Sequence, residues 1–169
     1  CARAKIECEI FVPENTAAGK LAQIQSYGAQ LIKIPGSRED TAQAALRAAE
    51  KIYYASHSWN PFFFQGEKTF AFEVCEQLGW QAPDSVVLPI GSGSLLLGAF
   101  IGFNELYHNG IIHKIPKIIG VQAACCAPIY KALRENLEEI PKIDKKDTVA
   151  EGIAIAEPIR GKQILEAVK

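Results

Sequence analysis

The stretch VVLPIGSGSLLLGAFIGFNELY, residues 86–107, decides the fold of this chain. It opens within an almost unbroken apolar run from Ser85 to Ile90, and such a run is typical of a parallel strand covered on both faces. A glycine- and serine-rich turn follows, and the segment from Leu95 to Tyr107 is apolar on almost every side, which predicts a buried helix. A further strand is expected at Lys117 to Val121. The stretch therefore indicates a β-loop-α-β unit with parallel strands.

The residues before this unit predict the same alternation. Ile6 to Val12 is β-prone and stops at Pro13, so a strand is expected there. Asn15 can cap a helix, and Gly28 is the residue type that ends one in the left-handed conformation. Gln30 to Ile34 then predicts a second strand.

A second helix is expected after Ser37-Arg-Glu-Asp40, which has the Ser-x-x-Asp form of a helix start. Ala42, Ala45, Leu46 and Ala49 recur at helical spacing on one face. Residues 53–66 show no clean period and suggest a connector. The fold class predicted for the whole chain is α/β, with parallel sheets and helices on both faces.

Composition narrows the class of partner. The 169 residues are 49% hydrophobic and 22% charged, with a net charge of −1, which describes a globular protein without a basic field. We expect no nucleic-acid partner, no membrane partner and a small-molecule ligand. Five cysteines without a Cys-x-x-Cys pair favour a cytoplasmic location. The absence of methionine and the start at Cys1 suggest a fragment of a longer protein.

Gly91-Ser-Gly-Ser94 is the one element with explicit chemistry. Glycines let backbone N–H groups converge on an anion, and the start of the following helix adds unsatisfied donors. A tight strand-to-helix turn without a ligand is an equally good interpretation of the loop alone. A dinucleotide site is disfavoured because the third glycine, Gly98, comes two positions late. A nucleoside triphosphate is disfavoured because Ala99-Phe100 follows Gly98, where a lysine and a hydroxyl are needed.

An ordered set of motifs resembles one enzyme family. The set is Pro13-Glu-Asn15, Tyr27-Gly28, Asn60-Pro61, Gln65-Gly-Glu-Lys-Thr69, Val86 to Ser94, and Thr148 to Gly152 with Glu157-Pro158. It is similar to the threonine synthases, in the β-family (fold type II) of pyridoxal-phosphate enzymes. The resemblance runs along nearly the whole chain.

The resemblance implies a site and a domain division. The phosphate of pyridoxal 5'-phosphate would be bound by backbone amides of Gly91, Ser92, Gly93, Ser94 and Leu95. Residues 1–56 would belong to a smaller, mobile α/β domain and residues 57–169 to a larger, cofactor-binding one. The substrate would be a small amino acid, and we expect the intact parent to be a homodimer.

The resemblance also implies what this fragment lacks. The Schiff-base lysine of the family would lie before Cys1, so no catalytic residue is assigned here and the fragment is expected to be inactive by itself. Lys20 and Lys68 are interpreted as surface or loop residues. No metal site is expected, because His108 and His113 are interpreted as surface residues.

One departure concerns the substrate pocket. The family carries Asn-Ser before Asn-Pro and an arginine two residues after that proline, whereas this chain has His57-Ser58 and Phe63. Loss of a guanidinium removes a bidentate phosphate ligand. His57 and Ser58 are the candidate substrate-binding residues, and a purely structural role for His57 is at least as good an interpretation.

The predicted function is therefore a threonine synthase-like lyase, acting in the intact parent on phosphohomoserine to give threonine and phosphate. A related enzyme of β-elimination or β-replacement on serine, threonine or diaminopropionate is the close alternative. A non-enzymatic phosphate-binding α/β module is the alternative from another class.

Overall fold

The computed structural model describes residues 1–144 and 146–168, and the chain divides into two compact units, Cys1–Ala55 and Ser56–Lys169. The division falls in the segment that lacks a hydrophobic period. Each unit contains its own pair of parallel strands with helices beside it. The assignment of the first unit to a mobile domain and of the second to a cofactor-binding domain stays a prediction.

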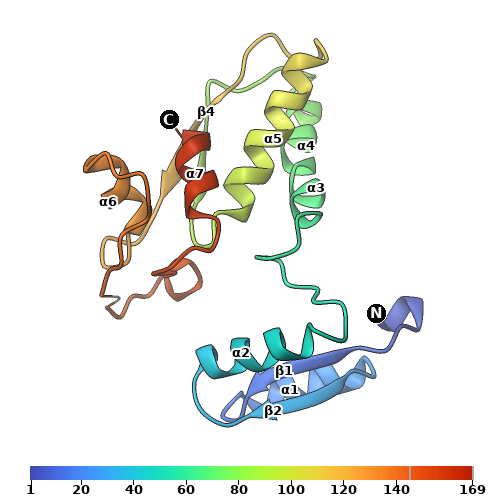
Figure 1. Ribbon diagram of the computed structural model, residues 1–169. Coiled ribbons are helices and arrows are strands. Elements are labelled where there is room, and N and C mark those ends of the chain that lie inside the picture. The colour runs from blue at the N-terminus through green and yellow to red at the C-terminus, as the bar shows by residue number, and fades with distance from the viewer. Residues whose placement is uncertain (145, 169) are drawn as a thin grey trace. The chain divides into compact units, whose positions relative to one another are not determined.

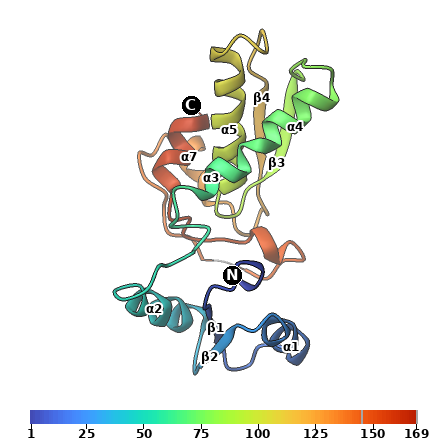
Figure 2. The same cartoon turned by 90° about the vertical axis from the view of Figure 1, so that its right-hand side faces the viewer.

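The first unit is a β-α-β-α fold. A short 3-10 turn, Ala2–Ala4, precedes strand β1 (Glu9–Pro13), helix α1 (Ala18–Ser26), strand β2 (Gln30–Ile34) and helix α2 (Arg38–Ala48). The strands pair in parallel from Glu9 with Gln30 to Pro13 with Ile34. Figure 2 shows these two strands between α1 and α2.

One local expectation for this unit was wrong, and another holds for only part of its residues. Asn15 does not cap α1, because the helix starts later in the chain, with Ala17 as its N-cap and no side-chain cap. In the turn before it, the Thr16 hydroxyl donates to the Pro13 carbonyl at 2.7 Å. On α2, Ala42 is exposed and the buried positions are Thr41 and Ala44. The other predicted positions, Ala45, Leu46 and Ala49, are partly buried, and the helix contacts β1 and β2.

The second unit contains helices α3 (Phe63–Glu67) and α4 (Thr69–Gln77), then strand β3 (Ser85–Pro89), helix α5 (Ser94–His108) and strand β4 (Lys117–Val121). Helix α6 (Pro128–Arg134), the 3-10 turn η2 (Glu151–Ile153) and helix α7 (Gly161–Val168) follow. Helix α3 thus begins inside the predicted connector, and its five residues are too few for a helical period to be recognised.

Helix α5 is the centre of the second unit. It contacts α3, α4, α7 and β4, and Figure 1 shows it between the β3–β4 pair and the α3–α4 segment. Leu96 and Phe103 on this helix are completely buried. The strands pair in parallel from Ser85 with Lys117 to Pro89 with Val121, as the apolar runs predict. The α/β fold class with parallel strands is confirmed.

One face of the β3–β4 pair differs from the sequence expectation. Val86 and Leu88 are buried, but Val87, between them, is 62% exposed. The continuous apolar run had predicted cover on both sides of the strand. Within the described residues, only the face toward α5 is covered.

Candidate functional site

The glycine loop, residues 91–93, joins the end of β3 to the start of α5. The Ile90 N–H donates to the Val121 carbonyl at 2.8 Å, which carries the pairing of β3 and β4 up to the loop. A β-carbon at Gly91 would lie 3.2 Å from the Ile153 Cα and 3.4 Å from the Gly152 oxygen. The main chain of η2 therefore lies against the loop, and a glycine at position 91 allows this approach.

Gly93 sets the direction in which the chain enters α5. It is the N-cap of the helix, with φ of +81°, in the left-handed region where glycine is favoured. A β-carbon at this position would also overlap Ile164 of α7, including its Cγ1 at 2.7 Å. Both conformation and packing therefore require glycine here.

The backbone amides of the loop are not used in hydrogen bonds within the described part of the chain. In the described part of the chain, no hydrogen bond is donated by the N–H groups of Gly91, Ser92, Gly93, Ser94 and Leu95. The first N–H groups of a helix have no partner within it, and the helix start carries about half a positive charge. Five consecutive donors at such a start can bind a phosphate group mainly through neutral backbone.

A carboxyl group lies beside this loop. The Ser94 hydroxyl donates to Glu67 Oε1 at 3.1 Å, and the Ser92 and Ser94 hydroxyl oxygens are 3.5 Å apart. Glu67 belongs to α3, whose packing on α5 brings it there. A β-carbon on Gly98 would lie 2.7 Å from the Glu67 Cβ, so the absence of a side chain at Gly98 admits α3.

The environment of Glu67 disfavours its charged form. Its Oε2 atom is buried without a hydrogen-bond partner among the described residues. Burial raises the pKa of Glu67, while the Ser94 hydrogen bond and the His57 side chain act in the opposite direction. In the sequence, Glu67 is one position of the Gln65 to Thr69 motif, and nothing in the local pattern shows that it reaches Ser94.

The candidate substrate residues lie in the segment before α3. The His57 ring packs at 59° to the Phe63 ring, with centroids 5.8 Å apart. The Ser58 carbonyl accepts a hydrogen bond from Arg160 Nε at 3.0 Å. The charge of the His57 side chain opposes the rise in the pKa of Glu67.

Arg160 is a residue that sequence reasoning missed. Besides Ser58 it donates from Nη2 to the Trp59 carbonyl at 2.9 Å, and its guanidinium carbon lies 4.7 Å from the centre of the Phe64 ring. It therefore fixes the segment that carries His57. Its partners are about one hundred residues away in the chain, so no local signal could have found it.

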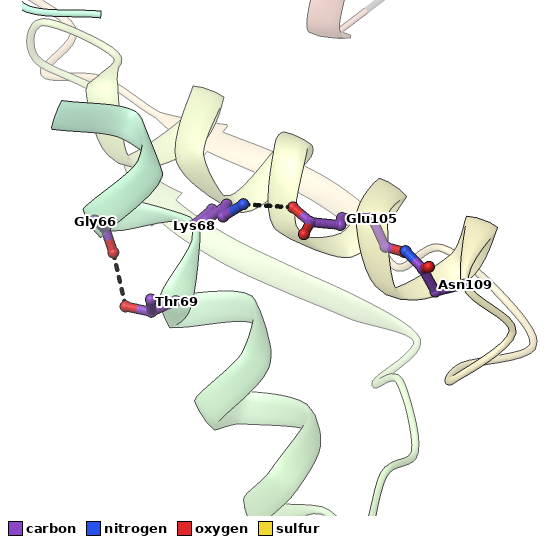
Figure 3. A network of polar contacts seen from close by, with 5 residues as sticks. All are labelled: Gly66, Lys68, Thr69, Glu105 and Asn109. Atoms are coloured by element: carbon purple, nitrogen blue, oxygen red, sulfur yellow. Dashed lines mark hydrogen bonds and ion pairs between the residues drawn. The ribbon is translucent and has the colours of Figure 1, made fainter. Parts of the chain in front are cut away.

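Lys68 has a structural role in this arrangement. Its Nζ forms an ion pair with Glu105 Oε2 at 2.6 Å, joining the α3–α4 junction to α5, as Figure 3 shows. At the same junction the Thr69 hydroxyl donates to the Gly66 carbonyl at 2.7 Å. These contacts hold the end of α3, and with it Glu67, against α5.

Other candidate groups lie apart from this cluster. His108 and His113 are exposed, and the Nδ1 of His108 is 2.7 Å from the Asn104 carbonyl oxygen. Cys126 is buried and Cys125 is partly so. Among residues 1–144 and 146–168, no group of three or more His, Cys, Asp or Glu side chains could hold a metal ion. No helix of this part has the length and apolar character to cross a membrane.

Comparison with known proteins identifies the family. The family model described as pyridoxal-phosphate dependent enzyme matches residues 1–169. The chain belongs to this family of pyridoxal-phosphate dependent enzymes. The resemblance inferred from the ordered motifs is thereby confirmed, and pyridoxal 5'-phosphate is the cofactor of the family.

Curated relatives show which enzymes within the family this chain resembles. The chain is 38% identical to the threonine synthase of Methanocaldococcus jannaschii over 169 residues, 99% of this chain and 42% of that protein. It is 35% identical to the threonine synthase of Methanosarcina acetivorans over 172 residues, again 99% of this chain and 42% of the relative. The chain thus spans less than half the length of these relatives.

Solved structures confirm the fold. The processed form of threonine deaminase isoform 2 from Solanum lycopersicum superposes with a TM-score of 0.78 and 25% identity, covering 96% of this chain and 46% of that one. Diaminopropionate ammonia lyase from Escherichia coli superposes with a TM-score of 0.70 and 20% identity, covering 97% and 42%. The chain has the fold of these enzymes over nearly all its residues.

Proposed function

We propose that this chain is part of a threonine synthase-like lyase that converts phosphohomoserine to threonine and phosphate, in threonine biosynthesis. The support is the match to threonine synthases at 35–38% identity along 99% of the chain. A small amino-acid substrate, a homodimeric whole protein and a cytoplasmic location belong to the same proposal.

The structural observation that supports cofactor binding is the set of amides from Gly91 to Leu95 that make no hydrogen bond within the described residues. They fit the phosphate of the cofactor, because the helix start supplies both donors and partial positive charge. The bound cofactor would supply an electron sink for carbanion chemistry. The residues of this chain would bind and orient it, and Ser92 and Ser94 add hydroxyl groups to the loop.

The substrate end of the site would be formed by His57 and Ser58. Both precede α3, and Arg160 donates hydrogen bonds to the carbonyls of Ser58 and the following Trp59. Phe63 stands where an arginine is expected for the substrate phosphate, and its ring packs on His57 instead. The segment that carries His57 and Ser58 is therefore held in place, but the phenyl ring of Phe63 replaces the guanidinium that would bind a substrate phosphate.

Phe63 favours a second candidate, a lyase that eliminates or replaces a β-substituent on serine, threonine or diaminopropionate. An apolar ring suits a substrate without a phosphate better than one with it. The solved deaminase and ammonia-lyase structures share the fold of this chain, and this likeness concerns the fold alone.

Product analysis of the full-length protein separates the two candidates. With phosphohomoserine, the first predicts release of inorganic phosphate together with threonine. With serine, threonine or diaminopropionate, the second predicts ammonia and a keto acid and little phosphate release from phosphohomoserine. Absence of both activities, with no cofactor absorbance near the imine band, would instead favour a phosphate-binding module without catalysis.

The cofactor-phosphate assignment has its own test. Pyridoxal lacks the phosphate, so its affinity for the full-length apoprotein should be lower than that of pyridoxal 5'-phosphate by about 100-fold or more, equivalent to one or two charge-assisted hydrogen bonds. Inorganic phosphate should compete with pyridoxal 5'-phosphate and not with pyridoxal. Equal affinities would show that the loop does not hold the phosphate.

We expect this chain, expressed by itself, to form no imine with the cofactor at one specific lysine, because the resemblance assigns the Schiff-base role to none of its lysines. Borohydride treatment followed by mass spectrometry checks this. A reduced cofactor attached to one specific lysine would contradict the expectation.

A further inference from the structure

Glu67 is an unusual neighbour for an anion site. Its Oε1 accepts the Ser94 hydroxyl at 3.1 Å, and Ser94 also provides one of the free amides of the loop. A hydroxyl that donates to a carboxylate is not donating to an anion, because it has a single hydrogen. A second negative charge this close to the loop also repels a bound anion.

The carboxylate has little else to stabilise its charge. Ser94 provides the one hydrogen bond found for it among the described residues, and Oε2 is buried without a partner. If the Ser94 hydroxyl turned away, neither oxygen of the carboxylate would have a donor among the described residues, and Oε2 would stay buried. A partly buried carboxylate that loses its donor takes up a proton more readily.

We propose that Glu67 is a positioning residue of the anion loop, which takes up one proton when an anion binds and then donates to the Ser94 hydroxyl oxygen. The proton comes from the solvent and forms an O–H bond on the carboxyl group. The Ser94 hydrogen is thereby released from Glu67 and donates to the anion. This inference rests on the proposed role of the glycine loop and goes beyond it.

Among the charged groups around Glu67, His57 is the one other group that could make anion binding depend on pH. From the segment before α3, His57 acts electrostatically on Glu67. The adjacent Lys68 is paired with Glu105 of α5, and Arg160 lies over the Phe64 ring of α3. Histidine ordinarily changes its charge near neutral pH, so the experiment must separate His57 from Glu67.

Sulfate is a suitable probe, because its charge stays constant across the range in which carboxyl groups and histidine titrate. We expect the affinity of the full-length apoprotein for sulfate, measured by calorimetry, to fall by up to about tenfold per pH unit above the pKa of Glu67, which is the slope for uptake of one proton. Binding in two buffers of different ionisation enthalpy should show this uptake directly.

Glu67→Gln is the decisive variant. An amide has nearly the same shape, can donate to the Ser94 oxygen at every pH and carries no charge. It should bind sulfate with an affinity that no longer depends on Glu67 ionisation and that exceeds that of the unmodified protein at high pH. Glu76→Gln, an exposed carboxylate on α4, removes the same charge and should leave the pH profile unchanged.

Difference infrared spectra provide a readout independent of affinity. Addition of sulfate to the unmodified protein should produce the C=O stretching band of a protonated carboxyl group, and Glu67→Gln should abolish it. Persistence of the pH profile in Glu67→Gln, and its loss in His57→Asn, would overturn the proposal while leaving the anion loop intact. No sulfate or phosphate binding at any pH would overturn the anion loop itself.

Discussion

Phe63 shows how one side chain bears on substrate choice. Its ring lies against His57 and is 41% exposed, so it contributes little to the core. A guanidinium in its place could bind a phosphate with two hydrogen bonds, which a phenyl ring cannot do. The residue therefore affects recognition more than folding.

Phe63→Arg in the full-length protein is expected to lower KM for phosphohomoserine by about tenfold or more, the effect of one charge-assisted hydrogen bond. KM for serine should stay nearly constant, since serine has no phosphate to bind. Steady-state kinetics with both substrates measure this. Unchanged turnover and affinity for phosphohomoserine would refute the placement of Phe63 beside the substrate phosphate.

At the scale of the element, helix α5 contains two glycines, Gly98 and Gly102, where neighbouring helices pack closely against it. Gly98 and Gly102 lie on the face where α3 and α4 cross it, and a β-carbon on Gly102 would lie 2.8 Å from the Ala71 Cβ. Glycine within a helix costs about 1 kcal/mol relative to alanine. The close crossing offsets this cost, because it buries the apolar face of α5 against neighbouring helices.

Gly102→Ala should therefore lower the free energy of unfolding, by about 1–2 kcal/mol, because overpacking exceeds the gain in helix propensity. Gly19→Ala in α1 is the matched control, since a β-carbon there meets no atom within 4 Å. The control should be neutral or stabilising by up to about 1 kcal/mol. Urea unfolding of both variants tests the difference, and equal effects would contradict it.

Helix α2 begins with a capping box in which Asp40 and Ser37 exchange hydrogen bonds. The Ser37 N–H donates to Asp40 Oδ2 at 2.7 Å, and the Asp40 N–H donates to the Ser37 hydroxyl oxygen at 3.1 Å. The hydrogen bond from the Ser37 backbone lowers the pKa of Asp40 from its usual 3.8. A carboxylate with a lowered pKa stabilises the folded state above its unfolded pKa.

The protection of α2 amides from hydrogen exchange should therefore fall as the pH drops below 3.8 and through the lower pKa of folded Asp40. In Asp40→Asn this part of the acid dependence should be absent. Ser37→Ala should reduce the stability of α2 by about 1 kcal/mol at neutral pH. Identical acid profiles for Asp40→Asn and the unmodified protein would disprove the role of the capping box.

At the scale of the whole molecule, contacts over long sequence separations hold the site together. Arg160, just before α7, fixes the main chain of Ser58 and Trp59 before α3. The main chain of η2 lies behind Gly91. The C-terminal part of the chain therefore supports both the glycine loop and the predicted substrate segment.

Arg160→Ala should release the segment before α3, and chymotrypsin should then cleave after Trp59 several-fold faster under native conditions. The reason is that a protease needs a locally unfolded main chain, and the variant loses two hydrogen bonds that prevent this. Lys162→Ala, an exposed position on α7, serves as the control and should leave the rate unchanged. Equal cleavage rates in the two variants would contradict the anchoring role.

The sequence by itself determined the parallel α/β class, the strands at residues 30–34 and 117–121, and the loop at residues 91–94. Local rules set these features: apolar runs form buried strands, and glycine after such a run turns the chain into a helix. Only the tertiary structure revealed α3 as a helix on α5, the exposure of Val87, and the contacts of Glu67 and Arg160. These features depend on contacts between residues that are distant in the chain and come together only when the helices pack. The local periodicity of a sequence contains no information about such contacts.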